Sequence, residues 1–147
     1  MLEVEVRVGE SLVRMLVIRD VEDGTWAMKY MIMTFGSQDT MMKTKSTEWI
    51  KEMIDFMTVI DSDLRASGEL VDDQGLVDPH QAKTVVFRDG APVAIDGPFV
   101  DPDQSLAGWW VVDVPDERRA TEIASRIVAF IEAPLEVRRI AEGPPEV

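Results

Sequence analysis

Two segments of this chain are apolar on both faces of the strands that they would form, and this feature limits the fold more than any other. Residues 29–35, KYMIMTF, and residues 109–114, WWVVDV, carry few polar side chains on either face. Because successive side chains of a strand point to opposite faces, each of these strands must be covered on both sides. Helices on one side of a sheet would leave a second apolar face that needs its own cover.

Two helices are predicted from apolar residues that recur at helical spacing. For the first, Ser46 offers an N-cap, Glu48 suits the first turn, and Gly68 is placed to end the helix as C′. The second begins at residues 115–116, presents one apolar stripe and ends at Pro134. The methionine and aromatic stripe of the first helix indicates core packing rather than a cofactor site.

An Asp-Gly pair between two apolar runs predicts a β-hairpin in the second half of the chain. Asp89 and Gly90 separate residues 82–88 from residues 91–95, which is the chemistry of a type I′ turn. Residues 96–99, the DGPF corner, follow at once. Its glycine permits φ > 0, its proline fixes the next φ near about −65°, and its aspartate can bond downstream amides. We therefore predict a stiff corner.

The other strands are predicted at residues 2–8, 11–21, 69–77 and 135–140. The first alternates strictly between apolar and polar residues. The second fits a strand or a short helix equally well, and a strand is preferred. The third carries polar intervals typical of an edge strand. Residues 36–45 are polar and predict an irregular connection.

The order of these elements predicts an α+β fold, the ferredoxin-like split βαβ repeat with an inserted β-hairpin. In that topology the first and third core strands are central, and they are the two that are apolar on both faces. A second copy is the simplest cover for the face without helices, so we predict a homodimer, a dimeric α/β barrel. The alternative is that the amino-terminal strands fold back over their own sheet or pair with the edge of the partner. Residues 1–27 are expected to be an amino-terminal extension whose strands pack on the barrel. Residues 28–141 then form the main domain and residues 142–147 a flexible tail.

Charge and composition exclude several classes of partner and chemistry. The net charge of −13, from 15 Lys and Arg against 28 Asp and Glu, disfavours nucleic acid and anionic membranes. The absence of cysteine excludes disulfides, thiolate nucleophiles and thiolate-bound metals. No apolar run approaches the ~20 residues of a membrane span, and no signal-peptide pattern is present. We expect a cytoplasmic protein without a cofactor.

The DGPF corner is the candidate site. Asp96 is the preferred catalytic candidate, because partial desolvation near the aromatic strand would suit it to act as a general base. The plainer alternative, an Asx turn that only shapes the corner, carries more weight. The candidate ligand-binding residues are Asp96, Gly97, Pro98, Phe99, Trp109, Trp110, Tyr30 and Met31. Trp109 and Trp110 are expected to point to opposite faces of their strand.

His80 is the only histidine. A metal site could be drawn from His80 with Asp72, Asp73 and Asp78, but their spacing matches no recognised ligand pattern. A solvated loop without a metal is therefore expected. The sequence also lacks a nucleophile elbow and a Gly-rich phosphate loop, so it supports neither a serine triad nor nucleotide binding.

Five segments occur in an order that resembles a known family. They are MKYMIMTFG from Met28, TVVFRDG from Thr84, DGPF from Asp96, LAGWWVVDV from Leu106 and LEVRRI near the end. Together they resemble the YCII-related family, specifically its DGPF branch, over about residues 28–140. The resemblance implies a dimeric ferredoxin-like α/β barrel. It implies little about activity, because most members are uncharacterised.

The chain departs from the family pattern in two respects. A segment like AETKE usually follows DGPF, whereas residues 100–104 read VDPDQ and lack the lysine. In YCII-like relatives of the lyase type, which act on small cyclic substrates, a histidine near the first helix forms an acid–base pair with an aspartate. The first predicted helix and the loop before it contain no histidine here, so that pair does not transfer.

Three functions remain open. The first is a small-molecule-binding barrel that takes a small cyclic or aromatic ligand. The second is a lyase or isomerase in which Asp96 moves a proton. The third is a non-catalytic regulatory or interaction protein. A cavity next to Asp96 would favour the first two functions over the third.

Overall fold

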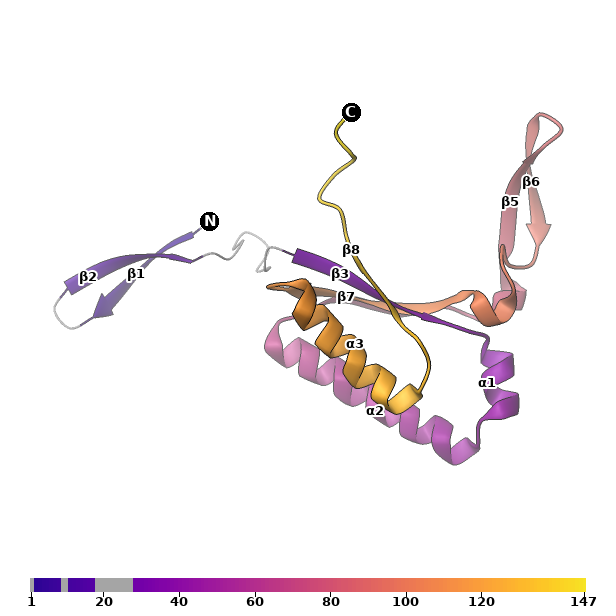
Figure 1. Ribbon diagram of the computed structural model, residues 1–147, viewed down its shortest axis with the longest axis horizontal. Coiled ribbons are helices and arrows are strands. Elements are labelled where there is room, and N and C mark those ends of the chain that lie inside the picture. The colour runs from indigo at the N-terminus through magenta and orange to yellow at the C-terminus, as the bar shows by residue number, and fades with distance from the viewer. Residues whose placement is uncertain (1, 9–10, 18–27) are drawn as a thin grey trace.

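The computed structural model describes residues 2–8, 11–17 and 28–147, which form an α+β fold with antiparallel sheets (Figure 1). The strands are β1 (Leu2–Val8), β2 (Ser11–Val17), β3 (Met28–Phe35), β4 (Leu70–Gly75), β5 (Lys83–Arg88), β6 (Ala91–Asp96), β7 (Leu106–Val114) and β8 (Glu136–Arg139). The helices are α1 (Gln38–Thr44), α2 (Thr47–Ser67) and α3 (Glu117–Ile131), with single 3-10 turns η1 (Pro79–Gln81) and η2 (Pro102–Gln104).

The main sheet has the strand order β4-β7-β3-β8, and every neighbouring pair is antiparallel. The two central strands, β7 and β3, are the ones that the sequence places at the centre, so that prediction is confirmed. Helices α2 and α3 lie side by side on one face of this sheet (Figure 1). The sheet of a single chain is open and does not close into a barrel.

The core lies between this sheet and the two long helices. Its fully buried side chains include Ile32 of β3, Val112 of β7, Ile60 of α2 and Ile127 of α3. Each such aliphatic side chain contributes about 1.5–3 kcal/mol by leaving water. None of the helices within the described residues combines the length and the apolar character that a bilayer span requires.

The ends of α2 are fixed by the capping residues that the sequence predicts. The Ser46 side chain accepts a hydrogen bond from the Trp49 amide at 3.1 Å. Gly68 ends the helix with φ of 76°, and its amide donates to carbonyls of the last turn. A left-handed C-cap of this kind is inexpensive only for glycine. Both cap predictions are confirmed.

Helix α1 corrects the prediction that residues 36–45 are irregular. Ser37 caps the helix by accepting a hydrogen bond from the Thr40 amide at 3.4 Å. An isolated helix of this length is unstable in water, so tertiary contacts must hold it. One of them is the hydrogen bond from the Ser37 hydroxyl to Asp78, 41 residues further along the chain. Local sequence patterns do not reveal such a contact.

The hairpin β5-β6 is a separate two-stranded sheet that projects beyond one end of the main sheet (Figure 1). Asp89 and Gly90 have φ of 51° and 81°, which confirms the predicted type I′ turn. Strand β4 lies at an edge of the main sheet, as its polar residues predict. Strands β1 and β2 pair with each other. The predicted packing of residues 1–27 on the barrel involves residues outside the described ones.

Candidate functional site

A cavity of about 650 Å³ opens where α1 and α2 approach the ends of β3, β4 and β7. This volume lies within the range of small-molecule sites in proteins. Its large apolar lining residues are Phe35, Met41, Trp49, Met53, Met57, Trp109, Trp110, Ile131 and Leu135. Its charged lining residues are Lys45, Asp61, Asp73 and Asp103.

Two glycines that face each other on neighbouring strands help to keep the cavity open. Gly75 of β4 and Gly108 of β7 are cross-strand partners, and both line the cavity. A Cβ atom at Gly108 would lie 2.7 Å from the Gln74 carbonyl oxygen, so this position admits no side chain without moving the backbone. A Cβ atom at Gly75 would meet nothing within 4 Å. Gly75 therefore borders the cavity and has open space for a side chain.

The two tryptophans of β7 point to opposite faces of the sheet, as predicted. The indole Nε1 of Trp110, on the helix side, donates to Asp61 Oδ1 at 2.9 Å. The indole Nε1 of Trp109 donates instead to Asp72 Oδ2 at 3.3 Å. Trp110 is 7 % exposed, so its bond to Asp61 fixes that carboxylate in the cavity wall.

Asp73 stands beside Asp61 in the same wall. A hydrogen bond with the Asp61 carboxyl raises the pKa of Asp73, and burial and repulsion from Asp61 act in the same direction. Arg65 opposes this shift, because its Nη2 lies 3.8 Å from Asp73 Oδ1. The cavity thus contains two neighbouring carboxyl groups that compete when both are ionised.

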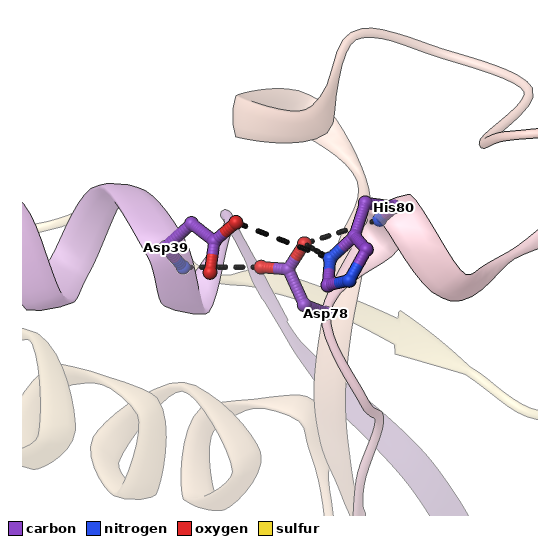
Figure 2. Close-up of side chains that lie close together, drawn as sticks. All are labelled: Asp39, Asp78 and His80. Carbon is purple, nitrogen blue, oxygen red and sulfur yellow. Dashed lines mark hydrogen bonds and ion pairs between the residues drawn. The ribbon is translucent and has the colours of Figure 1, made fainter.

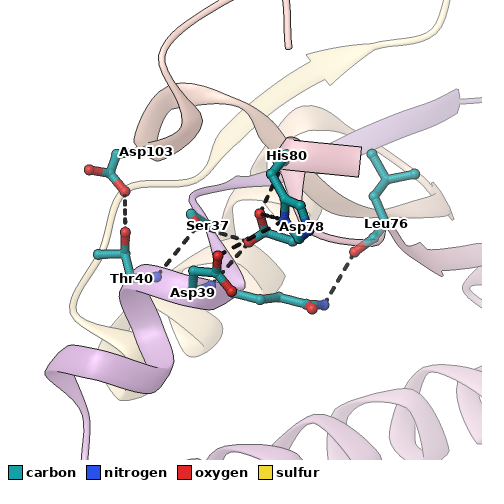
Figure 3. A network of polar contacts seen from close by, with 8 residues as sticks. Ser37, Asp39, Thr40, Leu76, Asp78, His80 and Asp103 are labelled. Atoms are coloured by element: carbon teal, nitrogen blue, oxygen red, sulfur yellow. Dashed lines mark hydrogen bonds and ion pairs between the residues drawn. The ribbon is translucent and has the colours of Figure 1, made fainter. Parts of the chain in front are cut away.

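A second polar cluster surrounds Asp78, next to the start of α1 (Figure 2). Asp78 Oδ1 accepts hydrogen bonds from the Ser37 hydroxyl at 2.9 Å and the Asp39 amide at 3.1 Å. Asp78 Oδ2 accepts from the His80 amide at 3.1 Å and lies 2.6 Å from His80 Nδ1. Figure 3 shows that these bonds tie α1 to the segment that precedes β5.

These bonds shift the titration of both partners. The hydrogen bond from His80, helped by the Asp39 and His80 amides, holds the pKa of Asp78 well below its usual range. The hydrogen bond to Asp78 raises the pKa of His80. Asp78 is 5 % exposed, whereas the His80 side chain is 63 % exposed. The pair therefore presents to solvent an imidazole that a buried carboxylate orients, an arrangement able to accept and release a proton.

Asp39, Asp78 and His80 each offer one potential metal-ligand atom, and these atoms lie within 4.8 Å of one another. Two ligands of a tetrahedral zinc ion at ~2.1 Å would be separated by roughly 3.4 Å. The 2.6 Å contact between His80 Nδ1 and Asp78 Oδ2 is shorter and fits a hydrogen bond. Asp72 and Asp73, the other two residues of the metal site considered from the sequence, lie on β4 instead.

Sequence reasoning missed the position of His80. No histidine lies in the first helix or the loop before it, but folding brings His80 to Asp78, which in turn binds the amide of Asp39 in α1. The only local signal was the Asp-Pro pair at residues 78–79, which begins η1. The hydrogen bond from the Asp39 amide to Asp78 joins residues 39 positions apart, and no local sequence pattern predicts it.

The DGPF corner lies outside the cavity wall. The Asp96 side chain is 87 % exposed and forms an ion pair with Lys83. Gly97 has φ of 105°, as the predicted corner requires, and its amide donates to the Ala82 carbonyl at 2.8 Å. Phe99 is 86 % exposed. The corner thus lies at the base of the hairpin, where β6 ends beside the start of β5, and its Asp96 and Phe99 side chains are exposed. A catalytic or binding role for it stays a prediction.

The remaining predicted site residues are divided between the two faces of the sheet. Tyr30 is buried in the core against the helices, while Met31 points to the opposite face. Trp109 and Trp110 are the two predicted site residues that line the cavity. The structure therefore does not bring the predicted set together within a single chain.

Comparison with known proteins places this architecture in a family. A search of the curated proteins finds no match. A comparison with protein-family models matches residues 28–143 to the YCII-related domain. The match begins at the first residue of β3 and extends past β8, so it includes every element of the main sheet and the cavity. The chain therefore belongs to the YCII-related domain family.

Proposed function

We propose that this protein binds a small organic molecule in the cavity between α1, α2 and the main sheet. The cavity of about 650 Å³ carries this proposal, because its volume and its mainly apolar lining suit a ligand of drug-like size. A few polar groups, among them Asp61 and Asp73, are placed to orient such a ligand. The exposed, ion-paired Asp96 favours this binding function over catalysis by the DGPF corner.

Filling the cavity should abolish binding without unfolding the protein. Gly75→Phe places a ring in space where a Cβ atom meets nothing within 4 Å, so we expect a folded protein that has lost its ligands. The measurement is a ligand-observed NMR screen of small neutral, anionic and cationic aromatic compounds against the wild type and the variant. Gly143→Phe is the matched control, because Gly143 also has open space around it and lies outside the cavity.

The outcomes separate clearly. Hits that bind the wild type and Gly143→Phe but not Gly75→Phe support the cavity as the site. A screen without hits, or hits that survive Gly75→Phe unchanged, would overturn the proposal. Circular dichroism of both variants checks that a loss of binding reflects the filled cavity and not a loss of structure.

We further propose that the main sheet is a ferredoxin-like sheet that pairs with a second copy to form a dimeric α/β barrel. The face opposite α2 and α3 carries Met31 and Met33 of β3 across from Val111 and Trp109 of β7. Such a row of apolar side chains is typical of a sheet face that another layer covers. A second copy would supply an identical layer through two-fold symmetry.

The dimer predicts a mass in dilute solution of twice the 16.5 kDa of one chain. Met33→Arg would place a charge in the middle of the shared face and should give a folded monomer, because a buried unpaired charge strongly disfavours association. Met42→Arg is the control, since Met42 is 65 % exposed on α1. Light scattering measures the molecular mass of the wild type, Met33→Arg and Met42→Arg in solution. A wild-type mass of one chain contradicts the dimer.

A further inference from the structure

The charges around the cavity are unbalanced. Asp61 and Asp73 lie in its wall and Asp103 at its rim, whereas Lys45 is the one cationic residue among the lining residues within the described part of the chain. Arg65, which does not line the cavity, approaches Asp73 from outside at 3.8 Å. A low-dielectric cavity strengthens the field of such carboxylates relative to bulk water. The potential inside therefore attracts a positive charge.

The aromatic wall already accommodates a cation. The Lys45 ammonium lies over the ring of Trp49, 4.8 Å from its centroid, at cation–π distance. This contact places the lysine ammonium against an aromatic ring of α2. Within the described residues, the one cation at ion-pair distance from Asp61 or Asp73 is Arg65, 3.8 Å from Asp73.

The geometry of the pair suits a hydrogen-bond donor with a positive charge. Asp61 already receives the Trp110 indole proton, so its orientation is fixed before a ligand arrives. The hydrogen bond with Asp61 raises the pKa of Asp73; the charge of Asp72 acts in the same direction and that of Arg65 in the opposite one. A ligand cation next to both carboxyl groups would relieve their mutual repulsion. An anionic ligand would add to that repulsion.

On the basis of the proposed binding function, we infer that the ligand class of this cavity is an aromatic or apolar amine. Its ammonium group would bind between Asp61 and Asp73, and its apolar body would lie against the Trp49, Met53 and Met57 side chains of α2. A primary ammonium carries three N–H donors, which suits two neighbouring carboxylates. The remaining apolar lining then excludes water from the ion pair, which increases its strength.

Three indole compounds of similar size test the inference. Tryptamine is cationic, tryptophol is its neutral counterpart with a hydroxyl group, and indole-3-propionate is an anion. Isothermal titration calorimetry of the wild-type protein at pH 7 should show tryptamine binding at least about tenfold more tightly than tryptophol. Indole-3-propionate should bind more weakly still.

Removing one negative charge from the pair should weaken tryptamine specifically. Asp73→Asn and Asp61→Asn keep the size of the side chain, and each should reduce tryptamine affinity by about tenfold or more while leaving tryptophol within about twofold. Asp63→Asn is the matched control. Asp63 lies on the same helix as Asp61, pairs with Arg126 at 2.8 Å and does not line the cavity. Its replacement should leave both affinities unchanged.

The experiment separates this inference from the proposed function. If tryptophol or indole-3-propionate binds as tightly as tryptamine, and Gly75→Phe abolishes that binding, the cavity is a binding site but the amine preference is wrong. Equal loss of tryptamine affinity in Asp63→Asn would also overturn the inference, because it would reflect overall charge. If none of the three compounds binds, the inference fails; the proposed function fails only if the broader screen also gives no hit that Gly75→Phe removes.

Discussion

Replacing Arg119 by alanine should lower the free energy of unfolding by about 2–3 kcal/mol at pH 7. Arg119 Nε and Nη2 donate to the two carboxylate oxygens of Glu69 at 2.7 and 2.8 Å. The Glu69 side chain is 9 % exposed, so the variant leaves a carboxylate in the interior without its cation. Arg119 is itself 40 % exposed, which places the expected loss below that of a fully buried pair.

The effect should depend on pH with a defined sign. The hydrogen bond from Arg119 lowers the pKa of Glu69 relative to its ordinary value, even though burial acts in the opposite direction. The pair therefore contributes its stability above the unfolded pKa of about 4.3, and this stability is lost as the pH falls through the lower folded pKa. Wild type and variant should consequently differ most near pH 7 and converge towards pH 3.

Urea denaturation at both pH values measures this difference. Arg118→Ala is the control on the neighbouring residue, whose exposed Nε pairs with Glu122 at 3.3 Å within the same helix. An exposed pair of this kind should contribute no more than about 0.5 kcal/mol. A loss of equal size in the two variants, or a difference that persists unchanged at pH 3, would contradict the assignment to Glu69.

The second large effect is expected at Gly108. A methyl group there would lie 2.7 Å from the Gln74 carbonyl oxygen and 3.4 Å from Gly75 Cα, and both are backbone atoms that cannot rotate away. Gly108→Ala should therefore force β4 away from β7 and cost about 2–3 kcal/mol of unfolding free energy. The same displacement would change the wall of the cavity that the two strands share.

Gly75→Ala provides the matched control for this prediction. Gly75 is the direct cross-strand partner of Gly108, but a Cβ atom there meets nothing within 4 Å. Because alanine restricts the unfolded chain more than glycine does, this variant should be neutral or up to about 1 kcal/mol more stable. Thermal and urea denaturation of the two variants gives the comparison, and similar behaviour of both would rule out the backbone clash as the cause.

The sequence predicted the features of the fold that depend on neighbouring residues. Ser46 and Gly68 bound α2 as their capping chemistry requires, and Asp89 with Gly90 forms the predicted turn. The two strands that are apolar on both faces, β3 and β7, are the central strands of the main sheet, as the predicted topology requires. These predictions rest on local backbone preferences and on alternation of side chains, which residues near in sequence determine.

Contacts between distant segments could not be predicted in the same way. Helix α1 depends on Asp78, and the cavity arises only where side chains of several elements meet. The glycine of the DGPF corner predicts a positive φ, and Gly97 has φ of 105°. However, turn chemistry does not determine location, and the corner lies at the base of the hairpin, where β6 ends beside the start of β5, instead of in the cavity wall.

The separation of the β5-β6 hairpin from the main sheet has a consequence for how this protein can diverge during evolution. Several apolar side chains of this hairpin face solvent, including Val85 at 66 % and Phe87 at 79 % exposure. Substitutions at such positions cost little folding energy, so selection for thermodynamic stability barely constrains them. Conservation of an aromatic residue near the tip of the hairpin would therefore indicate a binding partner of the hairpin. Conservation of one in β3 or β7 would indicate only a requirement for folding.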